Sequence, residues 1–265
     1  MKSTSKTILV PTDFTAVAGY ALQHAVRVST VIKEPVTLLH LVDSKDKLPE
    51  AKQIIDNLAE ETLNRYLIRP SVVVKEGSIF TDIAIIAQEV DASMIIMGSH
   101  SIKGKVSIND SWALQVITSS PVPFITIQEP PVNKRYDDVV FPVDYTSENK
   151  EKHKWITHFC NYYLSKFHLI KPHTTDPELM AKIDLNMASA QRYLDEKGAK
   201  YEVYTVKGEK GFAEEVLDIS VNIRADLIVI MTTKKGSDSS FIVEPQEQFI
   251  ISNASHIPVM SINPR

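Results

Sequence analysis

Residues 97–112, with the sequence "MGSHSIKGKVSINDSW", follow a short apolar run and precede a helical pattern. A strand that leads through a glycine-bearing loop into a helix is a common way to bind phosphate, because backbone N–H groups face the anion. Gly98, Gly104 and Ser111 are residue types suited to such a loop. Asp110, just before Ser111, instead places a negative charge where a phosphate would lie.

Acidic and histidine side chains follow several other apolar runs. Asp13 and Asp144 are interpreted either as residues that cap a following helix or as contacts to a bound ligand, in preference to a catalytic role. His100 either contacts a ligand or faces water. His40 and His168 are expected to be structural, because no second His, Cys or carboxylate stands at metal-ligand spacing in either half. No Ser–His–Asp set is found, so the sequence indicates neither a metal centre nor a hydrolytic triad.

The elements that must position these residues alternate along the whole chain. Short runs rich in apolar and β-branched residues have the length and composition of buried strands. The predicted strands cover residues 7–12, 36–42, 71–76, 94–98 and 123–127, and then 138–143, 167–171, 201–206, 226–232 and 258–262.

The segments between these strands carry apolar residues at helical spacing. In "AVAGYALQHAVRVSTVI", Ala18, Leu22, Ala25 and Val26 share one face. Strands that alternate with helices predict right-handed crossovers and a parallel sheet covered on both faces. The other predicted helices cover residues 49–68, 79–90 and 111–118, and then 148–165, 177–197, 212–222 and 245–253.

The chain repeats itself. The segment "KTILVPTDFT" at residues 6–15 matches "DDVVFPVDYT" at residues 137–146. Three later pairs follow in the same order: "VVVKEGSIF" with "YTVKGEKGF", "ASMIIMGS" with "ADLIVIMT", and "SSPVPFITIQ" with "ASHIPVMSIN". This repeat predicts two tandem domains, residues 1–131 and 132–265, each a doubly wound, five-stranded α/β domain.

The carboxyl ends of the strands are where such sheets bind ligands, at the point where strand order reverses. Three segments of the first half should meet there: "PTDF" after the first strand, "HLVD" at the end of the second, and the loop after the fourth. This expected convergence is the reason to treat the loop as a candidate site.

Composition limits the classes of partner. The chain has 29 basic and 33 acidic residues and a net charge of -4, so no basic surface argues for nucleic acid or an anionic membrane. The start lacks a long apolar region and no apolar run approaches membrane-spanning length, so a cytoplasmic location is expected. Cys160, the single cysteine, excludes an internal disulfide and is expected to be a buried core thiol.

Five motifs, each present in both halves, resemble the universal stress protein family. In the first half they are "ILVPTDFT", "LLHLVD", "KEG", "MIIMGSH" and "SSPVPFITIQ". In the second half they are "VVFPVDYT", "FHLIKP", "TVKG", "LIVIMT" and "SHIPVMSI". The resemblance covers nearly the whole chain as a tandem pair, and it implies Rossmann-like domains of the adenine nucleotide alpha hydrolase-like type.

The resemblance also implies an ATP site made by an aspartate after the first strand and a phosphate loop after the fourth. That loop reads glycine, two residues, glycine, nine residues, glycine and then serine or threonine. Gly98 fits the first glycine, but Ser101 takes the second position and Asp110 the third, if the loop is one residue shorter. ATP or another adenine nucleotide is therefore expected to bind weakly, near Pro11, Thr12, Asp13, Val42, Gly98, His100, Gly104 and Ser111.

The second half departs further from the family pattern. Met231 replaces the first glycine, and Glu244 and Glu247 lie near the start of the last helix, where carboxylates would occupy or repel a phosphate position. We therefore expect no nucleotide site in this half.

The resemblance implies a non-enzymatic stress-response protein, with slow ATP hydrolysis as the alternative. It further implies that the two domains form an intramolecular pseudo-dimer through their last strands, at residues 124–127 and 259–262. A homodimer of the tandem chain and unidentified protein partners stay open.

Overall fold

The computed structural model describes residues 6–99, 112–235 and 240–264. The chain divides into two compact units, Met1–Val132 and Asn133–Arg265. Each unit is a mixed α/β body in which helices alternate with parallel strands, so the predicted fold class is confirmed. The division lies one residue from the predicted boundary between residues 131 and 132.

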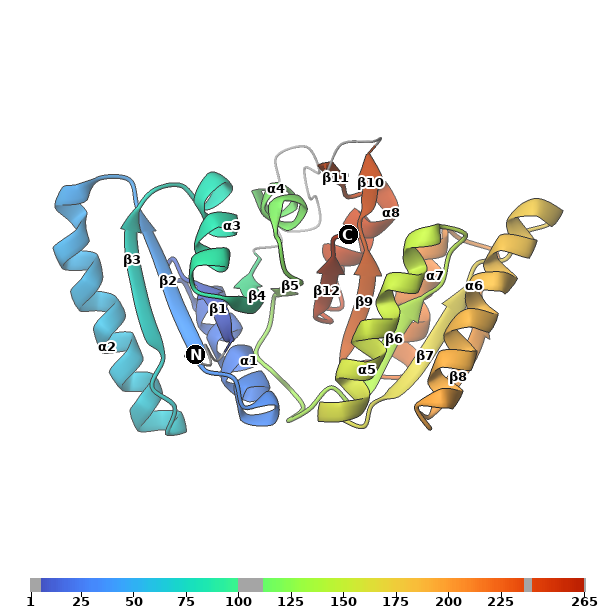
Figure 1. The fold of residues 1–265 in the computed structure, drawn as a ribbon, viewed down its shortest axis with the longest axis horizontal. Coiled ribbons are helices and arrows are strands. Elements are labelled where there is room, and N and C mark those ends of the chain that lie inside the picture. Colours follow the sequence, from blue (N-terminus) through green and yellow to red (C-terminus); the bar gives the residue numbers. More distant parts are fainter. Residues whose placement is uncertain (1–5, 100–111, 236–239, 265) are drawn as a thin grey trace, which may run out of the picture. The chain divides into compact units, whose positions relative to one another are not determined.

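The first unit is built on a parallel sheet. Its strands are β1 (Thr7–Pro11), β2 (Val36–Val42), β3 (Ser71–Glu76), β4 (Ala92–Gly98) and β5 (Phe124–Ile127). They pair in the order β3-β2-β1-β4-β5 (Figure 1). The strand order therefore reverses between β1 and β4, which is where this class of sheet opens a binding crevice.

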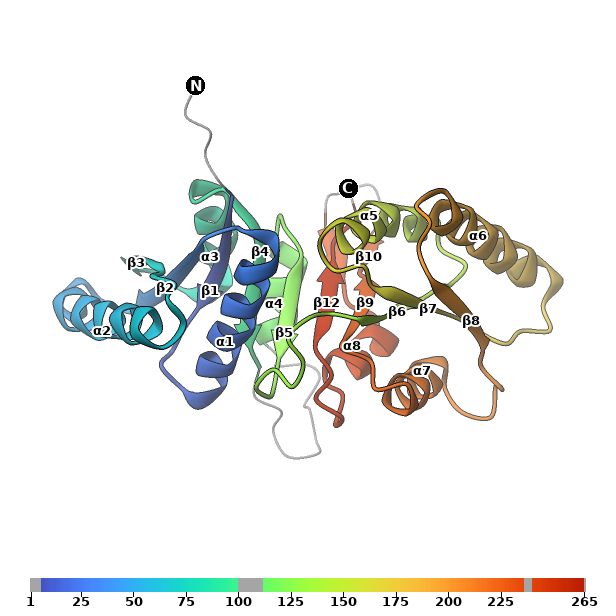
Figure 2. The same cartoon turned by 90° about the horizontal axis from the view of Figure 1, so that it is seen from below.

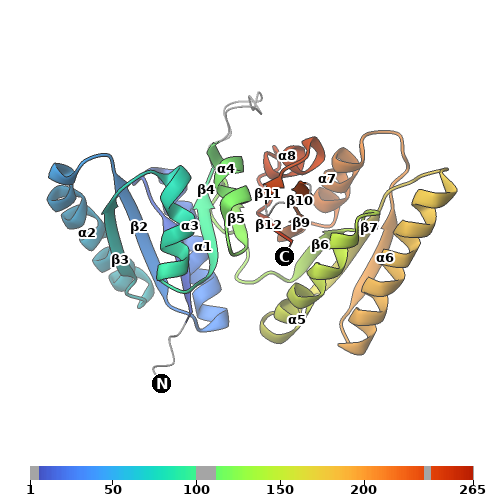
Figure 3. The ribbon, with the colours of Figure 1, turned by 45° about the horizontal axis from the view of Figure 1, so that its top comes forward.

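Helices cover both faces of this sheet. They are α1 (Ala16–Ile32), η1 (Lys45–Lys47), α2 (Leu48–Tyr66), α3 (Ile79–Glu89) and α4 (Trp112–Ser119). Figure 3 shows α3 and α4 in front of the strands and α1 behind them. This arrangement follows from right-handed crossovers that run in opposite directions on either side of β1.

The second unit repeats the plan. Its parallel strands are β6 (Asp138–Pro142), β7 (Lys166–Lys171), β8 (Tyr201–Thr205), β9 (Leu227–Met231) and β12 (Val259–Ile262). They pair in the order β12-β9-β6-β7-β8. The strands at the centre of both sheets are buried over nearly their whole length, and their apolar side chains form the cores.

The helices of the second unit differ from the prediction at one place. They are η2 (Ser147–Lys152), α5 (His153–Tyr162), α6 (Pro177–Glu196), α7 (Phe212–Asn222) and α8 (Pro245–Ile251). Within this unit, Figure 2 shows α5 and α6 on one side of the strands and α7 and α8 on the other. The single helix predicted over residues 148–165 is wrong, because six residues of 3₁₀ helix precede α5.

An antiparallel hairpin in the second unit was not predicted. It consists of β10 (Thr233–Lys235) and β11 (Ser240–Ile242) and lies in the segment that connects β9 to α8. The expectation for Cys160 is also wrong, because the thiol is partly exposed, although the burial it does have raises its pKa. Within the described part of the chain, no helix is long and apolar enough to cross a membrane.

Candidate functional site

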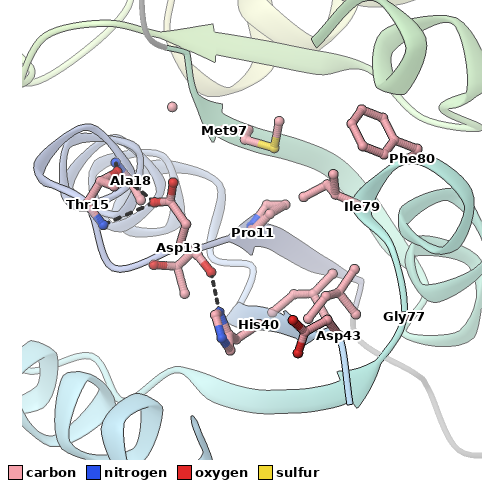
Figure 4. A pocket seen from close by; sticks show the side chains of 14 residues that line it. Pro11, Asp13, Thr15, Ala18, His40, Asp43, Gly77, Ile79, Phe80 and Met97 are labelled. Atoms are coloured by element: carbon pink, nitrogen blue, oxygen red, sulfur yellow. Dashed lines mark hydrogen bonds between the residues drawn. The ribbon is translucent and has the colours of Figure 1, made fainter. Parts of the chain in front are cut away.

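A pocket of about 420 Å³ opens in the first unit at the carboxyl ends of β1, β2 and β4 (Figure 4). This is the reversal point of the strand order, and the segments "PTDF" and "HLVD" meet there with the end of β4. The lining residues are Pro11, Thr12, Asp13, Thr15, Ala18, Leu39, His40, Leu41, Asp43, Gly77, Ile79, Phe80, Met97 and Gly98.

The turn after β1 positions Asp13 through local hydrogen bonds. The Asp13 carboxylate accepts from the Thr15 backbone N–H at 3.0 Å and from the Thr15 hydroxyl at 2.6 Å. Thr15, not Asp13, is the N-cap of α1, since its hydroxyl accepts from the Ala18 N–H. Asp13 thus supports the cap from outside the helix, and its exposed side chain lines the pocket.

Phe14 sits in the same turn with a left-handed backbone, φ 64°. For a non-glycine residue this conformation is strained, and it is kept only where surrounding contacts hold the backbone in place. The Phe14 N–H is held by the Thr12 hydroxyl at 3.0 Å, and the Phe14 ring lies 4.4 Å from the His40 ring, centroid to centroid. The turn is therefore braced on both sides.

His40, near the end of β2, joins the two strand ends. Its Nδ1 lies 2.7 Å from the carbonyl oxygen of Thr12, and because a carbonyl only accepts, Nδ1 carries the proton. His40 therefore has the structural role that was expected, and it also lines the pocket. Asp43 follows as a second carboxylate, and the hydrogen bond and charge of Lys47 lower the pKa of Asp43.

The far wall of the pocket is apolar. Ile79 and Phe80 begin α3, and Met97 lies near the end of β4, opposite Asp13, His40 and Asp43 (Figure 4). One wall therefore offers apolar surface for a flat ring, and the other offers carboxylates that accept from N–H and O–H groups.

Two glycines shape this pocket by lacking a Cβ. A Cβ at Gly98 would lie 2.6 Å from the backbone oxygen of Val17, so only glycine lets the first turn of α1 approach the end of β4 this closely. A Cβ at Gly77 would lie 2.6 Å from the Asp82 carboxylate. That carboxylate accepts from the Ser78 N–H at 2.7 Å, which holds the turn between β3 and α3.

The predicted site residues divide into three groups. Pro11, Thr12, Asp13 and Gly98 line the pocket. Val42 does not line it, because its side chain is buried, but its carbonyl accepts from the Gly77 N–H at 2.9 Å and so ties β2 to the turn after β3. The third group, which lies outside the described residues, consists of His100, Gly104 and Ser111.

Some lining residues were not predicted. Gly77, Ile79 and Phe80 follow β3, which sequence reasoning left out of the convergence of strand ends. The signal was present, since "EGSIF" combines a glycine with apolar residues directly after a predicted strand. No group of three or more His, Cys, Asp or Glu side chains suited to a metal ion occurs among the residues that the structure describes.

The corresponding strand end of the second unit is filled by its own side chains. Asp144 again accepts from the Thr146 N–H and hydroxyl, at 2.7 and 2.6 Å, and it also accepts from the Asn149 amide. The Asn186 amide donates to the carbonyl oxygens of Asp144 and Thr146. The Lys152 ammonium is buried among these groups.

Comparison with known proteins gives a family match over part of the chain and a fold for the whole chain. Residues 4–128 match the Universal stress protein family. None of the curated proteins is similar enough to this chain to be matched.

Among solved structures, a universal stress protein from Archaeoglobus fulgidus is 16% identical, with a TM-score of 0.75 over 98% of this chain and 97% of its own. A protein of unknown function from Pseudomonas aeruginosa is also 16% identical, with a TM-score of 0.66 over 98% of this chain and 92% of its own. These similarities show that the fold of the chain is that of a known universal stress protein.

Proposed function

We propose that this chain, in which residues 4–128 match the Universal stress protein family, is a stress-response protein that acts by binding rather than by catalysis. The proposed ligand is an adenine nucleotide, which the first unit binds weakly and the second unit does not bind. The observation that carries this proposal is the pocket of about 420 Å³ at the strand-order reversal of the first unit.

The two walls of the pocket fit the parts of a nucleoside. Ile79, Phe80 and Met97 form the apolar wall, which suits a flat base. Asp13 and Asp43 supply carboxylate oxygens on the other wall, which suit the N–H and O–H donors of a base and a sugar. The volume lies within the range of about 300–1,000 Å³ that is usual for small-molecule sites.

Weak binding is proposed because the phosphate loop has lost glycines. Ser101 and Asp110 stand where the family pattern has the second and third glycine. Backbone N–H groups must approach phosphate oxygens closely, and a carboxylate beside them repels the phosphate. Both residues lie in the segment 100–111, outside the described residues, so this part of the proposal depends on the sequence alone.

Calorimetric titration of the full chain with ATP and with AMP tests the proposal. We expect at most one site per chain, and two equal sites would contradict the assignment of binding to the first unit. A native mass spectrum of the purified protein would show in addition whether a nucleotide is carried and how many chains assemble.

A matched pair of variants places the site on the structure. Phe80 and Ile85 both lie on α3 and are 45% and 55% exposed, but only Phe80 is among the lining residues. Phe80→Ala should weaken nucleotide binding by roughly two- to tenfold, the effect of losing an aromatic contact worth about 0.5–1.5 kcal/mol. Ile85→Ala should leave it unchanged, and equal effects of both substitutions would place the ligand elsewhere.

Slow ATP hydrolysis is the alternative function. Hydrolysis requires a group that activates a water molecule beside the phosphates. Asp13 and Asp43 are the two carboxylates among the described lining residues, so they are the candidates for that role. Steady-state turnover of ATP well above the uncatalysed rate, and lost in Asp13→Asn, would replace the binding role with an enzymatic one.

A further inference from the structure

The second unit contains a buried ammonium group. Lys152 is only 4% exposed, and its Nζ donates to the carbonyl oxygen of Pro142 at 2.5 Å and to the side-chain oxygen of Asn149 at 3.1 Å. Pro142 is the last residue of β6, so the ammonium lies at the carboxyl end of that strand. A charged group is rarely placed so deep unless acceptors and opposite charges surround it.

Two carboxylates supply the opposite charge. Asp144 and Glu247 both interact electrostatically with Lys152, while burial lowers the pKa of Lys152 to about 8. One carboxylate oxygen of Glu247 is buried without a hydrogen-bond partner, and burial raises the pKa of Glu247. The ammonium is therefore the cationic centre of a group of acceptors contributed by β6, the turn after it, and α8.

The same position in the first unit is different. Lys152 follows Thr146 by six residues, as Ala21 follows Thr15 in the matching motif. Ala21 carries no charge and is fully buried, and the end of β1 lines an open pocket. The two halves thus have corresponding strand ends, and at this position only the second half has a side chain long enough to reach the strand end.

We propose that the Lys152 ammonium is a built-in ligand of the second unit. It occupies the acceptor atoms at the end of β6, namely the Pro142 carbonyl and the Asn149 side chain, and it balances Asp144 and Glu247. The acceptors at the end of β6 are then satisfied within the chain, so that this strand end needs no added molecule, whereas the matching strand end of the first unit is open. This inference is independent of which ligand the first unit binds.

Chemical rescue tests the proposal. Lys152→Ala removes the three methylene groups and the ammonium beyond Cβ, a piece that n-propylammonium reproduces. The variant should unfold roughly 5–10 °C below the parent chain, because it leaves a cavity and deprives the Pro142 and Asn149 acceptors of their donor. n-Propylammonium chloride should restore at least half of that loss, whereas equal concentrations of sodium chloride or n-propanol should not.

Lys152→Met is the matched control. Methionine fills most of the same volume without donating a hydrogen bond, so its unfolding temperature should not respond to n-propylammonium. The proposal is overturned if Lys152→Ala is as stable as the parent chain, or if n-propylammonium raises Lys152→Ala and Lys152→Met equally. If Lys152→Ala does not fold unaided, the folded yield after refolding with and without n-propylammonium is measured instead, and no increase overturns the proposal.

Discussion

Single residues show how similar sequence motifs acquire different roles. Asp13 and Asp144 occupy matching positions and accept the same two hydrogen bonds from the following threonine. The Asp13 side chain is exposed and lines the pocket, whereas Asp144 also accepts from Asn149 and faces the Lys152 ammonium. Neighbouring side chains, and not the aspartate itself, decide whether the strand end is open.

The charge of Asp110 is predicted to weaken nucleotide binding. A carboxylate about 5 Å from a phosphate, at an effective dielectric of about 20, costs about 3 kcal/mol per unit charge before screening. Solvent and salt reduce this to about 1–2 kcal/mol, which is roughly ten- to thirtyfold in affinity. Asp110→Asn should therefore bind ATP more tightly than the parent chain in a calorimetric titration at low salt.

The double change Ser101→Gly with Asp110→Gly should strengthen ATP binding further, because it restores both glycine positions. The gain in ATP affinity from replacing Asp110 should shrink as salt is added, because salt screens its charge. The gain in affinity from replacing Ser101 should not depend on salt. If none of these variants binds ATP better than the parent chain, the loop is not a phosphate site.

The burial of Lys152 predicts the direction in which the stability of the protein changes with pH. Its pKa is lowered from 10.5 in the unfolded chain to about 8 in the folded chain, mainly by burial. Between these values the unfolded chain holds more protons than the folded one, so the free energy of unfolding rises with pH. The full rise is about 3 kcal/mol, present above pH 10.5 and absent below pH 8.

The measurement is the free energy of unfolding of the parent chain and of Lys152→Met from pH 7 to pH 11, by chemical denaturation. Subtracting the two curves removes the other groups that titrate in this range. The difference should increase with pH between about 8 and 10.5, and a flat or falling difference would contradict the buried ammonium.

At the scale of elements, the two halves diverge in the first turn after the first strand. In the first unit α1 begins at Ala16, whereas in the second unit the 3₁₀ helix η2 runs from Ser147 to Lys152 before α5 begins. We attribute the difference to Gly98 and its counterpart Met231. A side chain at the end of the fourth strand of the fold removes the space that the first turn of α1 requires.

Gly98→Ala should destabilise the first unit. The added Cβ would lie 2.6 Å from a backbone oxygen, which cannot rotate away, so the helix must shift. We expect a loss of about 1–3 kcal/mol in the free energy of unfolding, the range of an overpacked core. The pocket should be distorted as well, because the moved turn carries residues that line it.

Gly19→Ala provides the control on the same helix. Gly19 lies within α1, and a Cβ there meets nothing within 4 Å. Alanine is the better helix former by about 1 kcal/mol, so this variant should be more stable than the parent chain. Urea denaturation of both variants decides the matter, and a mild effect of Gly98→Ala would mean that α1 tolerates a shift.

At the scale of the whole molecule, the repeat predicts that the units pair through their last strands. The motifs "PFITIQ" and "PVMSIN" end the two halves, and an apolar edge strand left uncovered is a site of aggregation. Each half expressed alone should therefore unfold at a lower temperature than in the full chain or form oligomers. Stable monomeric halves with unchanged midpoints would contradict this pairing.

The sequence by itself determined the two-domain α/β architecture. Local patterns of apolar residues predict the strands and helices, and each half repeats the same order of elements. It also located the carboxyl ends of β1 and β2 as the place of the site, since that follows from topology. It gave helix capping as one of two roles for Asp13, whereas Thr15 holds the cap of α1, and it predicted one helix where η2 and α5 lie. The cap depends on which of two neighbouring side chains accepts from the Ala18 N–H, and residue type and spacing do not distinguish Asp13 from Thr15 for that role.

The sequence already predicted that the second half has no nucleotide site, but only the tertiary structure showed which side chains occupy its strand end. Gly98 matters because Val17, 81 positions earlier, presses against it, and Lys152 matters because the end of β6 and α8 surround its ammonium. No local pattern shows that a lysine in "SENKEKHK" is buried, since a lysine among charged residues is ordinarily solvated. Burial is a property of the assembled unit, and it is the reason that similar sequence motifs give a pocket at the end of β1 and a buried lysine at the end of β6.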